Sequence, residues 1–306
     1  MLAAGAFLPR EEGALAVLTR RGWQRWYDAA HAPAAWPAPL PLVAEAVTWR
    51  PAGPGLALGS LRLSGAGEAW RVGVVLLRID PDSVRWALAW GMAEGDRKAW
   101  TIAAAPDSAQ FAVNAGMFNG SGPFGWTVID GVERRTIGSG ALAPAFVVDT
   151  AGRAALVPAE SLQARRARRD VALAFQSYPE LLRDDGGVPR MLRAGAAAID
   201  LEHRDARLAL GHRRDGQWLL VLTRFEGAGG ALSFLPFGLT VPEMAALMGA
   251  LGCDRAVSLD GGVSAQLAVH DPAEGWIRWR GVRKVALGLV GYPRAGSAVP
   301  PAAARP

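Results

Sequence analysis

The stretch GLTVPEMAALMGALGCDRAVSLDGG, residues 238–262, contains the clearest succession of elements in the chain. Thr240 and Glu243 are three residues apart, which is the spacing of a capping box at a helix N-terminus. Apolar residues then follow at i, i+3, i+4 and i+7 from Met244, and Gly252 stands where a helix C-terminal cap belongs. The stretch therefore predicts a capped helix that leads directly into an apolar strand.

Two turns in the sequence place polar residues and glycines at the end of an apolar strand. Residues 256–259 lead into Asp260-Gly261-Gly262, and residues 111–113 lead into Asn114 and then Gly116. Glycine allows a ligand to approach the backbone closely, and successive N–H groups in such turns bind anions. On physical grounds these turns indicate either a site of unspecified chemistry or two ordinary structural turns.

Most of the remaining chain reads as short strands separated by turn residues. The pattern predicts hairpins that pair residues 146–148 with 154–157 and residues 207–211 with 218–223. It also predicts a hairpin across Asp80-Pro81-Asp82, between residues 70–79 and 83–90. Many hairpins with few helices predict an α+β fold, with a largely antiparallel, curved sheet and a few packed helices in a single main domain.

The two ends of the chain differ in composition from the middle. Apolar residues at helical spacing predict a helix over residues 13–30, and the Pro/Ala-rich stretch 32–41 is typical of a linker. We therefore expect an N-terminal helix and linker in residues 1–42, the main domain in residues 43–293, and a disordered Pro/Ala tail in residues 294–306.

Composition excludes several classes of protein. The chain has 306 residues, of which 51% are hydrophobic, so wholesale disorder is excluded. No run reaches the roughly 18 apolar residues of a membrane span, so we expect no transmembrane segment. A single cysteine, Cys253, excludes a disulfide scaffold. The four histidines lack helical metal-binding spacing, so we expect no cofactor and no zinc site. Asp-Gly loops can bind calcium, but no D-x-[DN]-x-[DN]-G array is present to support it, and the metal requirement stays open.

The basic residues do not indicate a nucleic-acid partner. The net charge is +5, and the densest basic run, residues 165–169, has no interleaved aromatic residues. A solvated surface is the preferred interpretation of this run, and a polyanion-binding protein is the least favoured class of function. We therefore expect no nucleic-acid binding.

Five motifs, in order, resemble those of the phosphodiester glycosidase family. The family carries N-[GA]-G-[FM]-[FY] after a strand, matched by residues 114–118, and L-D-G-[GS]-x-S near its C-terminus, matched by residues 259–264. Between them, residues 124–131, 207–211 and 238–243 resemble its strand with a D-G turn, its R-x-A-x-G strand and its G-L-T-x-x-E helix start.

This resemblance covers roughly residues 70–291 and implies a hydrolase that cleaves the glycosidic bond of a sugar-1-phosphodiester. It implies that Asp260 acts in an oxocarbenium-like transition state, as a stabilising charge, a nucleophile, or an acid or base. It also implies that Arg207 clamps the phosphate and that Asn114 donates its amide to a phosphate or sugar oxygen. We expect these three catalytic residues to converge on one pocket. The expected substrate-binding residues are Gly116, Phe118, Gln176, Gly261, Gly262 and Ser264.

Each of these residues also has a structural alternative. No second carboxylate is evident in the sequence to share the role of Asp260. The structural alternative for Asp260 is an ordinary turn aspartate. The alternative for Arg207 is a surface ion pair on a strand, and for Phe118 a place in the core. Asn114 has the alternative of capping its own loop, and Ser264 that of capping a following helix. Tyr178 stands where the family usually has glycine, which departs from the pattern beside Gln176.

The resemblance also bears on substrate and location. It implies a carbohydrate phosphodiester of the cell envelope or of an exopolysaccharide as substrate, and a secreted or periplasmic, envelope-associated protein, with a cytoplasmic location as the alternative. The alternative function is a non-catalytic module that binds phosphoglycans or polysaccharides. The sugar, the aglycone, the stereochemical outcome and the oligomeric state stay open.

Overall fold

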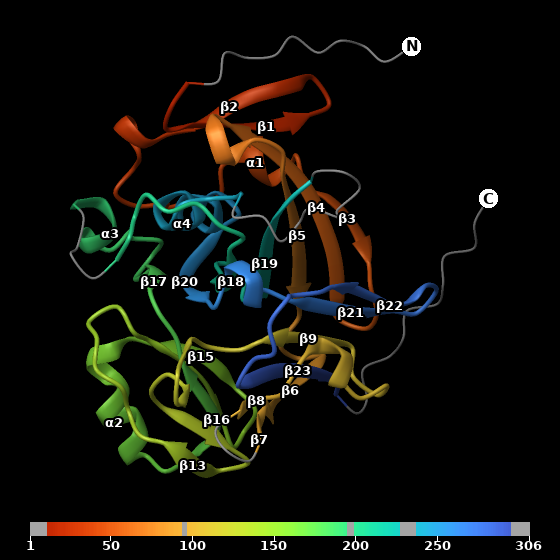
Figure 1. Ribbon diagram of the computed structural model, residues 1–306, viewed down its shortest axis with the longest axis vertical. Helices are drawn as coiled ribbons and strands as arrows, with labels where there is room; N and C mark the ends of the chain where they lie inside the picture. Colours follow the sequence, from red (N-terminus) through yellow and green to blue (C-terminus); the bar gives the residue numbers. More distant parts are fainter. Residues whose placement is uncertain (1–10, 94–96, 195–198, 227–236, 295–306) are drawn as a thin grey trace.

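The structure is a computed structural model that describes residues 11–93, 97–194, 199–226 and 237–294. Antiparallel strands dominate this part of the chain, and its helices are few and short (Figure 1). The fold is therefore mostly antiparallel β with a small helical component, as the α+β prediction expected.

The largest sheet has nine strands. They are β1 (Ala14–Thr19), β2 (Gly22–Asp28), β3 (Thr48–Pro51), β4 (Leu56–Gly65), β5 (Val72–Ile79), β17 (Glu180–Leu182), β18 (Leu208–Arg213), β19 (Trp218–Phe225) and β20 (Cys253–Leu259). Their order is β17-β20-β18-β19-β5-β4-β1-β2, and β3 also pairs with β4. The predicted hairpin of β18 and β19 is confirmed.

Two five-stranded sheets lie below the large sheet in Figure 1. One has the order β13-β12-β16-β14-β15 and the other β22-β21-β9-β23-β6. The first consists of β12 (Thr127–Ile129), β13 (Val132–Arg135), β14 (Ala145–Asp149), β15 (Ala154–Val157) and β16 (Val171–Gln176). The second consists of β6 (Val84–Trp90), β9 (Phe111–Asn114), β21 (Leu267–Asp271), β22 (Gly275–Trp279) and β23 (Leu287–Pro293). The predicted β14–β15 hairpin is confirmed.

Two short ribbons and four α-helices complete the described elements. The ribbons pair β7 (Met92–Ala93) with β8 (Arg97–Lys98) and β10 (Phe118–Asn119) with β11 (Gly122–Pro123). The helices are α1 (Pro41–Ala44), α2 (Leu162–Ala167), α3 (Arg190–Ala194) and α4 (Val241–Ala250).

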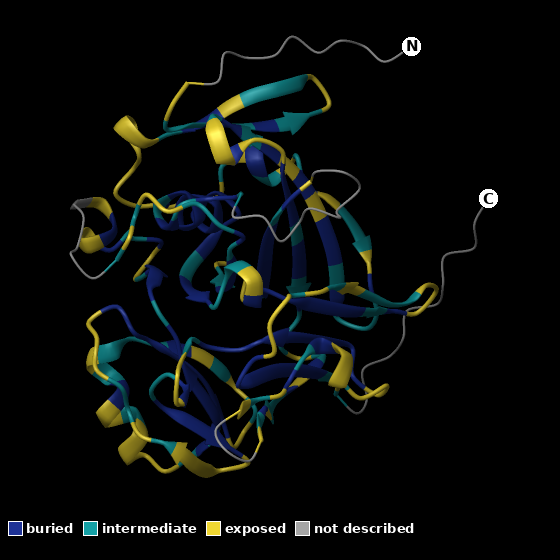
Figure 2. Cartoon of the chain, in the orientation of Figure 1, coloured by how far each residue is buried: buried dark blue, intermediate teal, exposed yellow. Residues whose placement is uncertain are grey.

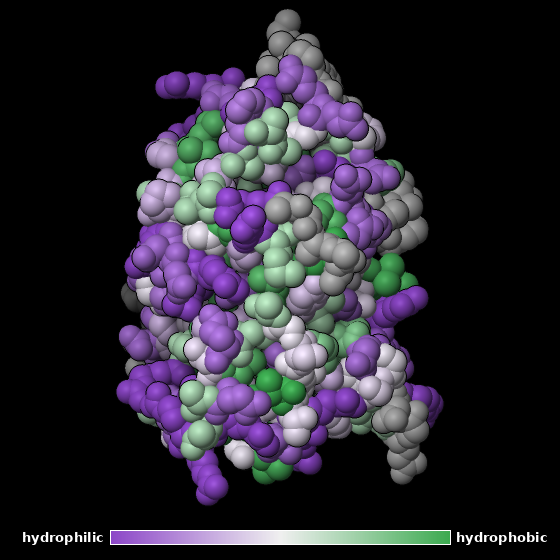
Figure 3. All heavy atoms as spheres, turned by 90° about the vertical axis from the view of Figure 1, so that its left-hand side faces the viewer, coloured by the Kyte–Doolittle hydropathy of each residue, from purple (hydrophilic) through white to green (hydrophobic). Residues whose placement is uncertain are grey.

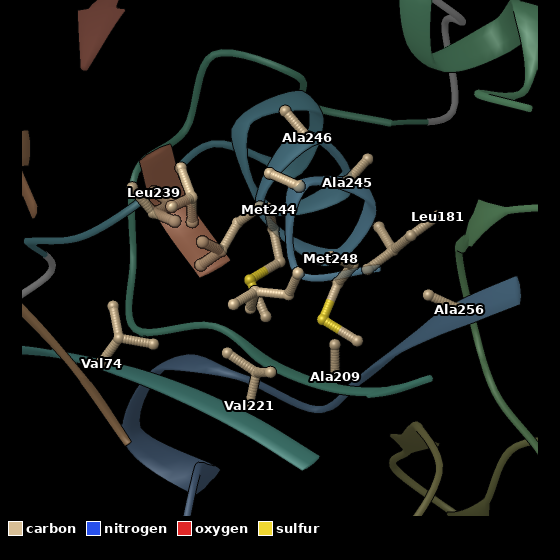
Figure 4. Close-up of a cluster of buried hydrophobic side chains, with 14 of the residues drawn as sticks. Val74, Leu181, Ala209, Val221, Leu239, Met244, Ala245, Ala246, Met248 and Ala256 are labelled. Carbon is tan, nitrogen blue, oxygen red and sulfur yellow. The ribbon is translucent and has the colours of Figure 1, made fainter. Parts of the chain in front are cut away.

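Helix α4 covers one face of the large sheet. The predicted capping box is present, because the Thr240 hydroxyl accepts the Glu243 N–H at 3.2 Å and the Glu243 carboxylate accepts the Thr240 N–H at 2.9 Å. Met244 and Met248 point from the helix toward the sheet residues Val221 and Ala209 (Figure 4). The burial of these apolar side chains is the main term that holds the helix to the sheet.

The opposite face of the large sheet packs against both five-stranded sheets. Trp218 of β19, Phe146 of β14 and Trp86 of β6 meet there with ring centroids 5.0 to 6.1 Å apart, in edge-to-face arrangements. Figure 2 shows strands of all three sheets as buried where they face one another. One apolar core therefore joins the three sheets.

The predicted helix over residues 13–30 is wrong. These residues form the β1–β2 hairpin, which joins the large sheet through the pairing of β1 with β4. Leu15 and Val17 are buried at the alternating spacing of a strand, and Gly22 opens the second strand with φ of +97°. The stretch predicted as a linker is mostly exposed, but its Trp36 is 8% exposed and lies against Gly249 of α4.

The hairpin predicted across Asp80 is also wrong, although both strands exist. Strand β5 pairs with β4 and β19 in the large sheet, whereas β6 pairs with β23 in a five-stranded sheet. The turn, in which the Asp80 carboxylate accepts the Ser83 hydroxyl at 2.7 Å, sends the chain from one sheet to the other. The predicted tail falls almost wholly on residues 295–306, outside the described residues.

The surface is predominantly polar where Figure 3 shows it. Hydrophilic side chains spread over this face, and apolar ones are scattered between them. Among the described residues, none of the helices is both long and apolar enough to span a membrane.

Candidate active site

The two glycine-containing turns meet in space although they are 146 residues apart. The Asn114 side-chain amide donates to the Asp260 carbonyl at 2.9 Å, and the Asp260 N–H donates to the Gly116 carbonyl at 3.0 Å. The Asn114 amide oxygen also accepts the Gln266 N–H at 2.9 Å. The Asn114 side chain therefore contacts the Asp260 main chain, where β9 ends and directly after β20. The convergence of the Asn114, Arg207 and Asp260 side chains on one pocket stays a prediction.

Asn114 holds the Asp260 turn in place. The residue is fully buried, and both ends of its carboxamide bond to protein groups. The expected donation of this amide to a ligand oxygen does not fit that burial. The structure assigns Asn114 a positioning role instead.

The pKa of Asp260 is set by its burial and by the charged and polar groups around it. Burial, with a smaller contribution from the negative charge of Asp205, raises the pKa of Asp260 to about 6. The hydrogen bond from the Ser264 hydroxyl and the positive charges of Lys98 and Arg283 oppose this rise. The carboxyl group therefore changes protonation state close to neutral pH, which suits a group that reacts.

Gly261 and Gly262 bring this turn into close contact with residues 205 and 206. A Cβ on Gly261 would lie 2.5 Å from the Ala206 carbonyl oxygen, and a Cβ on Gly262 would lie 2.5 Å from an Asp205 carboxylate oxygen. The Gly262 backbone also has φ of +55°, which disfavours other residues. The structure thus shows a packing reason for both glycines, and their contact with substrate stays a prediction.

Asp205 is a second carboxylate beside the Asp260 turn, and the sequence analysis missed it. Its Oδ1 accepts the Ala206 N–H at 2.8 Å, and its other oxygen lies 3.6 Å from the His203 ring. Asp205 precedes the recognised R-x-A-x-G motif and has no motif of its own. The packing of Gly262 against Asp205, and the effect of the Asp205 charge on the pKa of Asp260, show that the two carboxylates are near each other.

Two basic residues near Asp260 were also missed. The Lys98 ammonium lies 4.5 Å from the centroid of the Phe118 ring, in cation–π contact. Arg283 is held at the turn through its N–H, which donates to the Val263 carbonyl at 3.1 Å. The one available signal was that Lys98 is one of two lysines in the whole chain. Phe118 is half-buried, and Lys98 occupies one face of the ring on which a sugar was expected to stack.

The Arg207 guanidinium is engaged by the protein. Its Nε donates to the Leu239 carbonyl at 2.8 Å and its Nη2 to the His203 carbonyl. Burial lowers the pKa of Arg207, and the charges of Asp205 and Glu243 oppose this. The Arg207 backbone lies against Gly261, but these bonds hold the guanidinium at main-chain carbonyls, so it is not the open phosphate clamp that was expected.

Gln176 is a structural residue, which corrects its expected role in substrate binding. Its amide oxygen accepts the N–H groups of Trp126 and Gly138 at 2.9 and 2.8 Å. Its amide nitrogen donates to the carbonyls of Gly138 and Ala143 at 3.0 and 2.8 Å. Both lone pairs and both hydrogens are used and the residue is 1% exposed, so no group remains for a ligand.

Within the ranges that the structure describes, no group of three or more His, Cys, Asp or Glu side chains could hold a metal ion. The candidate site consists of Asp260 and its neighbours. Its essential features are a carboxylate of raised pKa, a hydroxyl donor, and two cations beside it.

The chain is similar to known proteins in sequence and in fold. A family model described as phosphodiester glycosidase matches residues 107–292. The catalytic domain of zebrafish N-acetylglucosamine-1-phosphodiester alpha-N-acetylglucosaminidase, auto-inhibited by its pro-peptide, is 14% identical with a TM-score of 0.54. That likeness covers 81% of this chain and 84% of the zebrafish chain.

A hypothetical protein from Synechocystis is 15% identical with a TM-score of 0.50, over 92% of this chain and 68% of the other. These two likenesses show a shared fold. No curated protein matches the sequence.

Proposed function

The chain belongs to the phosphodiester glycosidase family, and from this premise we propose that it hydrolyses the glycosidic bond of a sugar-1-phosphodiester with Asp260 as the reacting carboxylate. One observation carries the proposal. Asp260 lies where two family motifs meet, half-buried and with its pKa raised to about 6.

The ionised form of Asp260 is the active form in this proposal. As the bond from the anomeric carbon to the phosphate oxygen breaks, its electron pair goes to the phosphate, and positive charge develops on the sugar. A carboxylate in a partly desolvated site stabilises that charge more strongly than one in water. Water supplies the new oxygen on the anomeric carbon, and the proton that it loses passes to the released phosphate monoester or to solvent. The phosphate leaving group needs little protonation, since its second pKa is about 6.

Lys98 and Arg283 are the proposed phosphate-binding groups. They are the cations whose charges act on Asp260, whereas the Arg207 guanidinium donates to main-chain carbonyls. Cations beside the reacting carboxylate would neutralise the leaving phosphate as its charge grows. Ser264 orients the Asp260 carboxylate, and Asn114 with Gly116 holds the turn.

The proposed substrate class is a glycan phosphodiester of the cell envelope or of an exopolysaccharide. Support comes from the family and from the printed name of the zebrafish neighbour, which specifies a sugar-1-phosphodiester. Such a substrate implies a secreted or periplasmic protein, and we propose that location.

Hydrolysis in water enriched in ¹⁸O tests the proposal. Cleavage between carbon and oxygen puts the label on the sugar hydroxyl, whereas cleavage between phosphorus and oxygen puts it on the phosphate. The substrate is a synthetic N-acetylhexosamine-1-phosphodiester, and Asp260→Asn is the inactive control. Label on the phosphate would contradict the proposal. Binding without turnover would favour the non-catalytic phosphoglycan module instead.

A further inference from the structure

A cavity of about 250 Å³ adjoins the Asp260 turn. Gly262 and Val263 of that turn line one part of it, and Gly281 and Val282 line another. Arg224, near the end of β19, and Arg280, directly after β22, supply its charged side chains. No acidic residue is among the described residues that line it, so the cavity has a positive character.

The two arginines differ in exposure. Arg224 is half-buried, and burial lowers its pKa, which shows that its charge is partly desolvated. Arg280 is exposed at the cavity and forms no ion pair within the described residues. A partly desolvated guanidinium with a second one nearby is a suitable arrangement for binding an oxyanion, since arginine can donate two parallel hydrogen bonds to phosphate or carboxylate.

The cavity is firmly connected to the candidate active site. The N–H groups of Val282 and Arg283 both donate to the Val263 carbonyl, at 2.7 and 3.1 Å. A Cβ on Gly281 would lie 3.0 to 3.1 Å from carbonyl oxygens of residues 263–265, so this segment packs tightly on the turn. Residues 280–283 therefore supply Arg280 to the cavity and Arg283 to the surroundings of Asp260.

The volume limits what the cavity can hold. Pockets for drug-sized ligands are roughly 300–1,000 Å³, so this one suits a small charged group and not a length of polysaccharide. Asp205 touches Gly262 from the 205–206 segment and is not among the lining residues.

We propose that this cavity is a subsite for a second oxyanion of the substrate, so that the preferred substrates are sugar-1-phosphodiesters whose aglycone carries a further phosphate or carboxylate. The inference rests on the proposed function. The subsite would make the enzyme prefer multiply charged glycans over singly charged ones, through Arg224 and Arg280.

The experiment compares three synthetic sugar-1-phosphodiesters with the same sugar. Their aglycones carry a neutral group, an added phosphate monoester or an added carboxylate. Each is measured with wild type, Arg280→Gln, Arg280→Lys and Arg224→Gln. Arg20→Gln is the control, because Arg20 is an exposed arginine in the β1–β2 turn and its loss changes the net charge equally.

Wild type is expected to favour a charged aglycone, in kcat/KM, by about tenfold or more. Arg280→Gln and Arg224→Gln should abolish most of that preference while leaving the neutral substrate within about twofold, and Arg280→Lys should keep part of it. Preference for phosphate alone would assign a phosphate subsite, and preference for both would assign a general oxyanion subsite. Equal losses on neutral and charged substrates, or the same loss in Arg20→Gln, would overturn the proposal.

Binding of the three compounds to Asp260→Asn separates this inference from the proposed function. If wild type turns over none of them, the proposed function fails. A tighter Kd for the charged compounds in Asp260→Asn, lost on adding Arg280→Gln, would still support the subsite. Equal Kd values for all three compounds would contradict it, whatever the turnover.

Discussion

Asp149 and Asp260 both stand at the end of a buried strand and begin a turn, but their carboxylates are held in different ways. The Asp149 carboxylate accepts the N–H groups of Ala151 and Arg153, both at 2.9 Å, and the Arg153 Nε at 2.8 Å. Burial alone would raise the pKa of Asp149, but these hydrogen bonds and the Arg153 charge hold it below its usual value. Burial of Asp260, by contrast, raises its pKa to about 6.

The difference shows what separates a structural turn aspartate from a candidate reactive one. The Asp149 carboxylate accepts hydrogen bonds from the backbone of its own turn, and these bonds stabilise its charged form. The main chain of Asp260 is bonded instead to the Asn114 side-chain amide and to the Gly116 carbonyl, so the Asp260 carboxylate is not needed to hold the turn. Identical residue types in similar sequence contexts thus have opposite pKa shifts.

The largest expected contrast is in activity. Asp260→Asn removes the negative charge with little change in shape and should lower kcat by about a hundredfold or more, as for loss of a positioned acid–base group. Asp149→Asn should leave kcat within about twofold. Steady-state kinetics on a sugar-1-phosphodiester measure both, and near-normal turnover by Asp260→Asn would reduce Asp260 to a turn residue.

The dependence of activity on pH gives the next contrast. If the ionised carboxylate is active, kcat/KM of wild type should rise with pH through a midpoint near 6 and lie about tenfold below its plateau at pH 5. Asp149→Asn should show the same profile, because that residue is already ionised throughout this range. A profile that falls as pH rises through 6 would mean that the protonated form is active.

Stability should change in opposite directions in the two variants. At pH 7 the ionised, partly desolvated Asp260 opposes folding, because its folded-state pKa is raised. Stability is therefore lost as pH rises from about 4 to above 6. Asp260→Asn should raise the free energy of unfolding at pH 7 by about 1–3 kcal/mol, and this gain should vanish near pH 4.

Asp149→Asn should instead lower the free energy of unfolding at pH 7 by about 1–3 kcal/mol, since it loses charge-assisted hydrogen bonds. Urea denaturation at the two pH values measures both variants. Destabilisation of equal size in the two would show that Asp260 is a structural residue like Asp149.

The smallest expected effect tests the electrostatic neighbours of Asp260. Lys98→Met removes a positive charge that lowers the pKa of Asp260, so the midpoint of the pH profile should move upward by about half a unit to one unit. Arg20→Gln, with the same loss of charge far from the site, should leave the midpoint unchanged. A downward or absent shift in Lys98→Met would contradict the assigned environment.

Local signals account for the parts of the fold that the sequence predicted correctly. Helix α4 follows from a capping box and helical spacing within one stretch, and the β14–β15 and β18–β19 hairpins follow from their turns. Partners distant in sequence could not be predicted in this way. Strands β5 and β6 are adjacent in the chain but pair in different sheets, because each gains its partners from remote segments.

The β1–β2 hairpin was misread for a related reason. Its apolar residues fit helical spacing as well as strand alternation in so short a stretch, and the pairing of β1 with β4 decides between them. At the site, motif resemblance identified the Asn114 and Asp260 turns, which do meet.

Resemblance could not separate binding residues from structural ones, as the saturated hydrogen bonds of Gln176 show. Nor could it identify Lys98, Asp205 and Arg283. They come from three separate segments and act on Asp260 only through long-range packing.

A carboxyl ¹³C NMR titration of Asp149 and Asp260 tests the central claim most directly, with each resonance assigned from the spectrum of its Asn variant. The account predicts that Asp260 titrates near pH 6 while Asp149 titrates below the usual value of an aspartate. Titration of both carboxyl groups below pH 4 would contradict it, because Asp260 would then be a stabilised turn carboxylate like Asp149.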